Sequence, residues 1–341
     1  MPVQAIGFVC DRRILFHAHP ALHSADSVQY TERVTEDNFI KPARLCAGAR
    51  VALIAPAGPV TEERIASSIA RCELLGLDPV VGANAHLRTD YLAGSDVERA
   101  RDVMWAFSDP EIHAVWALRG GYGTMRLHDH LDFDVIARTH KPYIGFSDNT
   151  YIHLMLAARR VVSYHGPHAG ADFPAETEAA FLRVLFGDDP PGMLPLRSGD
   201  PEPRTLRGGL AHGRLIGGNL SLLAATCGTT AQLDARDSIV FIEEIGEPGY
   251  RVDRCLTQLI MAGALAGVRG FAFGRFTEIP EGHTEEEIMT LLADVADYFD
   301  VPAVVDFPVG HIEHNWTIPV GVPALLDADA GVLEMLAPAV R

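Results

Sequence analysis

The chain has 341 residues and a formal net charge of −17 with neutral histidine, from 28 Lys and Arg against 45 Asp and Glu. Hydrophobic residues make up 48% of it, which is enough to form a folded core and excludes intrinsic disorder. A surface of this charge repels phosphates, and no cluster of Lys and Arg offers a local exception, so we predict no nucleic-acid partner.

Cysteine content and the N-terminal residues indicate a cytoplasmic location. The five cysteines are widely spaced and odd in number, unlike a disulfide framework or a Cys-rich zinc site. The sequence has no run of about 18 apolar residues, and its start, MPVQAIGFVCDRR, lacks the basic-then-apolar order of a signal peptide. We therefore predict a cytoplasmic protein that does not span or bind a membrane.

Regular structure is predicted to begin near residue 50. Residues 1–40 show no sustained hydrophobic period, and we interpret them as an N-terminal extension. The apolar run 51–57 is typical of a buried parallel strand. Thr61 is placed to cap a helix that Gly76 ends.

Strands and helices then alternate. A short strand over 79–83 precedes a helix that opens with a capping box formed by Ser95 and Glu98. Further strands are predicted over 113–121, 142–146 and 161–166, with a helix over 148–159. The alternation predicts a mostly parallel sheet, and we assign residues 41–190 to an N-terminal α/β domain.

Pro, Gly, Ser and Asp dominate the next stretch, so residues 191–209 are predicted to form a linker. Residues 210–341 then form a predicted C-terminal domain. Its expected elements are strands over 238–244 and 270–276, helices over 250–265 and after Thr284, and short strands toward the C-terminus.

Ser147 lies where an apolar strand gives way to a helix, in the sequence GFSDN (145–149). At such a corner the serine hydroxyl projects outward, and helix N-terminal N–H groups can stabilise the negative charge of an acyl-transfer intermediate. Asn149 replaces the last Gly of the G-x-S-x-G elbow, and a simple helix cap by Ser147 or Asp148 is the alternative.

Two Gly-rich turns are candidates for binding. RGGYG (119–123) follows a strand, at the edge where parallel sheets place ligands, and matches neither the Walker A nor the dinucleotide motif. IGGN (216–219) is predicted as a turn that opens a helix and can bind an anion such as a carboxylate. In both cases tight packing is the alternative.

Acids and histidines of the C-terminal half can complete a site. Glu243 and Glu244 end a strand, where a carboxylate can orient a histidine; an ion pair to Arg251 or Arg254 is the alternative. His311 and His314 lie in a Gly- and Pro-rich segment, and either can serve as a general base. Together with His165 and His168 they also suggest a metal site, although HExxH is absent.

Ordered blocks over residues 40–341 resemble the LD-carboxypeptidases of serine peptidase family S66. The blocks are KPARL, VALIAPAGPV, RGGYGTMRL, KPYIGFSDNT, HGP, LIGGNLSLL, FIEEIGEPGYRVDRCLTQL, GFAFGRFTE and VGHIEHNWTIPVG. The resemblance implies a flavodoxin-like N-terminal parallel-sheet domain, a smaller β-rich C-terminal domain, and an active site between them. It also implies a homodimer.

The same resemblance implies a triad of Ser147 as nucleophile, Glu243 as acid and His311 as base, with Glu244 and His314 as the nearest competitors. Backbone N–H groups of Gly121 and Asp148 would form the oxyanion hole. No metal and no organic cofactor are expected. Candidates for binding a free substrate carboxylate are Arg251, Arg254, Gly217 and Gly218.

The implied substrate is a murein tetrapeptide, whose terminal D-Ala is released from the L-centre of a diamino acid during cell-wall recycling. A sister branch, the microcin immunity peptidases, cleaves an aminoacyl-nucleotide analogue and is the first alternative. A muropeptide-binding protein without catalysis and a metallohydrolase are the others.

Overall fold

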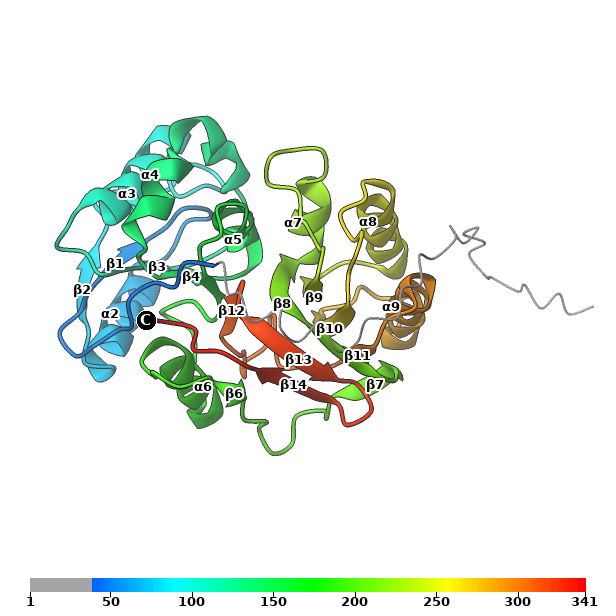
Figure 1. Ribbon diagram of the computed structural model, residues 1–341. Coiled ribbons are helices and arrows are strands. Elements are labelled where there is room, and N and C mark those ends of the chain that lie inside the picture. The colour runs from blue at the N-terminus through cyan, green and yellow to red at the C-terminus, as the bar shows by residue number, and fades with distance from the viewer. Residues whose placement is uncertain (1–38) are drawn as a thin grey trace, which may run out of the picture.

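The structure is a computed structural model that describes residues 39–341 (Figure 1). Apart from Phe39 and Ile40, the predicted extension 1–40 lies outside the described residues. Phe39 is buried, and Ile40 N–H donates to the carbonyl of Arg160.

The first sheet has six strands in the order β12-β5-β4-β3-β1-β2. They are β1 (Arg50–Ile54), β2 (Asp78–Val81), β3 (Ala114–Ala117), β4 (Tyr143–Gly145), β5 (Ser163–His165) and β12 (Ile318–Val320). Strands β1 to β5 pair in parallel in the order 2-1-3-4-5 of a flavodoxin-like sheet, which confirms the predicted fold class. β12 comes from the far end of the chain and pairs antiparallel with β5.

Helices accompany this sheet as the alternation predicted. They are α2 (Glu62–Leu74), α3 (Asp96–Ser108), α4 (Phe133–Thr139), α5 (Thr150–Ala157) and α6 (Ala175–Leu185), with short 3-10 turns over Met125–His130 and Ser147–Asn149. The predicted caps are present, since Thr61 accepts from Arg64 N–H and Ser95 forms its capping box with Glu98. Helices α4 and α6 have no predicted counterpart. Helix α4 has only seven residues, after its cap Asp132, and α6 starts after Pro174 without any side-chain cap.

The second sheet has eight strands in the order β6-β14-β13-β8-β9-β10-β11-β7. They are β6 (Gly192–Met193), β7 (Arg204–Arg207), β8 (Leu210–Asn219), β9 (Ser238–Ile245), β10 (Gly270–Thr277), β11 (Ala303–Val305), β13 (Pro323–Asp327) and β14 (Val332–Met335). Strands β8 to β11 are parallel and the outer ones antiparallel. Residues 191–209, the predicted linker, contribute β6 and β7 to this sheet, and the domain boundaries stay a prediction.

Helices α7 (Leu220–Ala225), α8 (Gly249–Met261) and α9 (Glu285–Phe299) belong to this second half, on the right in Figure 1. The expected capping box of α9, between Thr284 and Glu287, is present. In the part of the chain that the structure describes, no helix is both long and apolar enough to cross a membrane.

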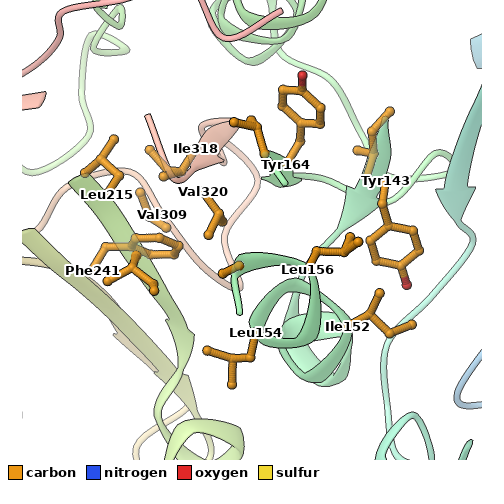
Figure 2. Packing of buried hydrophobic residues seen from close by; sticks show 14 of the residues in the cluster. Tyr143, Ile152, Leu154, Leu156, Tyr164, Leu215, Phe241, Val309, Ile318 and Val320 are labelled. Atoms are coloured by element: carbon orange, nitrogen blue, oxygen red, sulfur yellow. The ribbon is translucent and has the colours of Figure 1, made fainter. Parts of the chain in front are cut away.

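One hydrophobic core joins the two sheets. Figure 2 shows Ile318 and Val320 of β12 close to Phe241 of β9 and Leu215 of β8, with Leu154 of α5 nearby, and all five are buried in one cluster. Leu215 also exchanges backbone hydrogen bonds with residues 321 and 322, which follow β12. Because interiors are close-packed, this shared core fixes the carboxyl ends of β4 and β9 relative to each other.

Candidate active site

Ser147 occupies the predicted corner, directly after β4 and Phe146, at the start of the 3-10 turn that leads into α5. Its backbone has φ +63°, in the left-handed region. A residue other than glycine is strained in this region. Such strain persists where the surrounding structure imposes it, which is often at functional sites. A strained strand-to-helix corner is also how α/β hydrolases present a nucleophile.

A hydrogen-bonded chain runs from Ser147 through His311 to Glu243. His311 Nε2 lies 3.0 Å from Ser147 Oγ, and its Nδ1 lies 2.8 Å from Glu243 Oε2. When the ring proton is on Nδ1, this N–H donates a hydrogen bond to the Glu243 carboxylate. Nε2 can then accept a hydrogen bond from the serine hydroxyl. These residues come from the end of β4, the end of β9 and the loop between β11 and β12, so folding brings together the three that the family resemblance selects.

Glu243 sets the electrostatics of this chain. Its side chain is fully buried, whereas that of His311 is 17% exposed. Burial disfavours the charged imidazole, but the hydrogen bond and charge of Glu243, helped by the charges of Glu244 and Glu278, outweigh it and raise the pKa of His311. Burial holds the pKa of the neighbouring His165 and His168 well below the usual value. His311 is therefore the histidine of this group that is suited to exchange protons near neutral pH.

The two competitors point to other partners. Glu244 accepts hydrogen bonds from the side chains of Asn219 and Ser221 and from backbone N–H groups, so it ties β9 to the start of α7. His314 Nδ1 lies 2.8 Å from Asp200 Oδ2. Neither residue is bonded to Ser147.

The RGGYG turn lies against the nucleophile. A Cβ atom on Gly120 would come within 2.9 Å of Ser147 Cβ and 3.3 Å of Asp148 N. Thr124 fixes this contact, because its N–H donates to Asp148 Oδ2 (2.8 Å) and its hydroxyl to the Asp148 carbonyl (2.6 Å). Gly121 has φ +111°, and among residues 39–341 its N–H has no hydrogen-bond partner. The predicted oxyanion donors thus lie near Ser147, and their role stays a prediction.

Three residues without a predicted role in the site support the corner. The Phe146 ring packs on His311 and on His168, at centroid distances of 4.8 and 4.4 Å. The Asn149 amide donates to the Phe146 carbonyl and contacts His168 Nε2, and Tyr143 donates its hydroxyl to Asn149 Oδ1. The one sequence signal for this was Asn149 itself, where the chain departs from the G-x-S-x-G pattern.

The predicted turn at 216–219 is wrong, because these residues are the end of strand β8 and Asn219 caps α7. A Cβ on Gly217 would lie 1.8 Å from the Phe241 carbonyl oxygen, and one on Gly218 would lie 2.6 Å from the Thr150 side chain. Both glycines thus permit close approach of β8 to β9 and α5, and their contact with substrate stays a prediction.

The sequence candidates on α8 already have partners. Arg251 Nε lies 2.9 Å from Glu247 Oε2, and the Arg254 guanidinium stacks over the Tyr250 ring. Their role in binding a carboxylate stays a prediction. Across residues 39–341 no group of three His, Cys, Asp or Glu side chains is placed to hold a metal ion.

We expect Gly217→Ala to lower the free energy of unfolding by about 3 kcal/mol or more, because the backbone of β9 cannot move away from the added methyl group. Gly249 is the matched control, since a Cβ there meets atoms only at 3.4 Å or beyond. Urea unfolding followed by circular dichroism measures both variants. Equal stabilities would contradict the packing role.

Comparison with known proteins identifies the family of this chain. Residues 51–166 match the LD-carboxypeptidase N-terminal domain, and residues 212–326 match the LD-carboxypeptidase C-terminal domain. A Streptomyces coelicolor protein with an attributed carboxypeptidase activity is 42% identical over 310 residues, which cover 88% of this chain and 97% of that protein. The chain belongs to the LD-carboxypeptidase family, peptidase family S66.

Other family members extend the comparison. The murein tetrapeptide carboxypeptidase of Pseudomonas aeruginosa is 32% identical to this LD-carboxypeptidase family member over 314 residues, covering 88% of this chain and 98% of that one. The crystal structure of an MccF-like protein from Bacillus anthracis superposes with a TM-score of 0.79 at 25% identity, covering 87% and 99% of the two chains. This protein therefore has the two-domain architecture of the family. Its relatives support a peptidase of the carboxypeptidase class.

Proposed function

We propose that this protein is a serine LD-carboxypeptidase that releases the terminal D-Ala of murein tetrapeptides from the L-centre of a diamino acid. The observation that carries the proposal is the hydrogen-bonded chain from the strained Ser147 through His311 to the buried Glu243. The Pseudomonas aeruginosa relative supports the substrate class. A cytoplasmic location, a role in cell-wall recycling and a homodimeric state belong to the same proposal.

The residues suit acyl transfer without any other group. His311 Nε2 accepts the hydroxyl proton while Ser147 Oγ attacks the scissile carbonyl carbon, and Glu243 stabilises the imidazolium that forms. The developing oxyanion accepts from the N–H groups of Gly121 and Asp148. D-Ala leaves as an amine that takes its proton from His311, and water then hydrolyses the ester on Ser147 with His311 as base.

A second candidate function is supported by the MccF-like structure. MccF is the microcin C7 self-immunity protein, and it has been crystallised with aspartyl sulfamoyl adenosine. A hydrolase for aminoacyl-nucleotide analogues would use the same three residues and differ in the substrate pocket. The murein reading stands first because the relative named for murein tetrapeptide is 32% identical, whereas the MccF structures with ligands are 21% identical and speak for the fold alone.

Kinetics with both substrates test the proposal. We expect the purified protein to release D-Ala from a murein tetrapeptide with a kcat/KM at least about 100-fold above that for an aminoacyl sulfamoyl adenylate, because only the cognate substrate fills the pocket in the transition state. The reverse preference would assign the protein to the immunity branch. Saturable binding of the tetrapeptide without D-Ala release would make it a binding protein.

A further inference from the structure

A hollow of about 600 Å³ opens beside the nucleophile corner, where β1 and β3 end. Its lining includes Gly121, Arg88, Asp90, Tyr91, Arg119 and Tyr122. The two tyrosine rings meet edge to face at 5.7 Å and are more than half exposed. The hollow therefore shares Gly121 with the candidate oxyanion hole, and its walls carry two arginines, one aspartate and two tyrosines.

Arg119 is fixed at this wall by the turn that contacts the nucleophile. It directly precedes Gly120, which packs on Ser147, and its NH1 group donates to the Pro59 carbonyl at 2.9 Å. Within the described residues it has no ion pair, whereas Arg99 and Arg126 both bind Asp96. Its other guanidinium N–H groups are available to a ligand, and the fork of an arginine matches a carboxylate.

A second arginine packs on the segment that holds His168. Arg64 is in the first turn of α2, and its Cδ lies against Gly170 in the segment after β5. Burial, and then the charge of Arg119, lower the pKa of Arg64, while Asp172 partly opposes them. The charges of both arginines also help to lower the pKa of His168, after burial. The contacts agree with this. Arg64 packs on Gly170, two residues after His168, and the Arg119 carbonyl accepts from the same Asn149 amide that contacts His168 Nε2. Both arginines therefore lie around the histidine that packs beside Phe146.

We propose that Arg119 and Arg64 form a subsite that binds a carboxylate of the peptide substrate. The inference rests on the proposed function and places the substrate anion on the β1–β3 side of Ser147 instead of at Arg251, which is paired with Glu247, or at Gly217 and Gly218, which pack on protein. A local pair of cations offsets the −17 charge, whose field opposes an acidic peptide. The anion is the carboxylate of the terminal D-Ala or one within the peptide.

The test compares a tetrapeptide ending in free D-Ala with the same peptide ending in D-alaninamide. We expect Arg119→Gln and Arg64→Gln each to lower kcat/KM for the free acid roughly 10- to 100-fold and to leave the amide unchanged. Arg119→Lys keeps the charge and restores part of the preference. Arg138→Gln is the matched control, because Arg138 is exposed on α4 and has no ion pair among residues 39–341. A general loss of structure would slow both peptides without changing their ratio.

The outcomes separate the two proposals. If the bound carboxylate is internal, the arginine substitutions lower kcat/KM equally for both peptides. Amidation of that internal carboxylate then removes the effect of the substitutions. Unchanged kinetics in both arginine variants, or a loss found only in Arg251→Gln, would overturn the subsite. Should the protein release no D-Ala, the Kd values of the two peptides for Ser147→Ala, with and without Arg119→Gln, still report on the subsite while the proposed function falls.

Discussion

Replacing Ser147 with Ala is expected to lower kcat for D-Ala release by about 10⁴-fold or more, because without the hydroxyl no acyl-enzyme can form. Binding should change little, since His311, Glu243 and the surrounding turns stay in place. Release of D-Ala by the purified variant, together with its circular dichroism spectrum, measures the effect. Ser67→Ala is the matched control: Ser67 is exposed on α2, and within residues 39–341 its hydroxyl donates to the carbonyl of Glu63 alone.

Ser147→Gly adds a second test from the same residue. The φ of +63° strains alanine as it strains serine, whereas glycine adopts it freely. We therefore expect Ser147→Gly to be as inactive as Ser147→Ala and more stable by about 1 kcal/mol in urea unfolding. If Ser147→Ala were as active as Ser67→Ala, Ser147 would not be the nucleophile. If the glycine variant were the less stable of the two, the corner would not be strained.

Much of the fold follows from local sequence signals. The caps at Thr61, Ser95 and Thr284 and the apolar run 51–57 identify their elements because both depend on neighbouring residues alone. The pairing of β12 with β5 does not follow from such signals. It joins residues 318–320 to 163–165, and this contact is set by the core that the two sheets share.

The site is predictable in its members and not in its geometry. Ser147, Glu243 and His311 stand out by residue type and motif, but His311 is 164 residues from Ser147 and 68 from Glu243 in the chain, so only the folded sheets set their distances. The choice of Glu243 over Glu244 depends on which face of β9 points to the site, because successive strand residues point to opposite faces.

The candidate residues for substrate binding were the least predictable from the sequence. The Gly217–Gly218 pair suggests a turn in the sequence, yet it is a strand end, since glycine signals close backbone approach as readily as a turn. Arg119 opens the RGGYG turn, but the motif was selected for its glycines and not for the arginine. The proposal for Arg119 rests on the contact of Gly120 with Ser147 and on the hollow beside Gly121, which exist only in the folded chain.

Glu243→Gln is expected to lower kcat by about 10⁴-fold while leaving the shape of the site nearly unchanged. A Gln amide that donates to His311 Nδ1 would place the imidazole proton on Nε2, where it cannot accept from Ser147. The neutral side chain also cannot stabilise the imidazolium. The wild-type kcat/KM should fall on acidification through the raised pKa of His311, because only the neutral imidazole is a base. In Glu243→Gln the carboxylate charge that raises the pKa of His311 is gone, so burial lowers this pKa. The residual activity should therefore persist to lower pH.

Glu244→Gln is the matched control, one residue further along β9. Each Glu244 carboxylate oxygen accepts two hydrogen bonds, so an amide NH₂ in place of one oxygen loses acceptor sites, and we expect about 1–3 kcal/mol less stability with kcat largely kept. Glu243 Oε1, in contrast, is buried and has no hydrogen-bond partner within residues 39–341, so the Glu243 variant should keep its stability and lose its rate. pH profiles of kcat/KM and urea unfolding of both variants measure these opposite effects on rate and stability. A rate loss in Glu244→Gln as large as in Glu243→Gln, or an acid limb that Glu243→Gln leaves in place, would show that Glu243 does not act on the base.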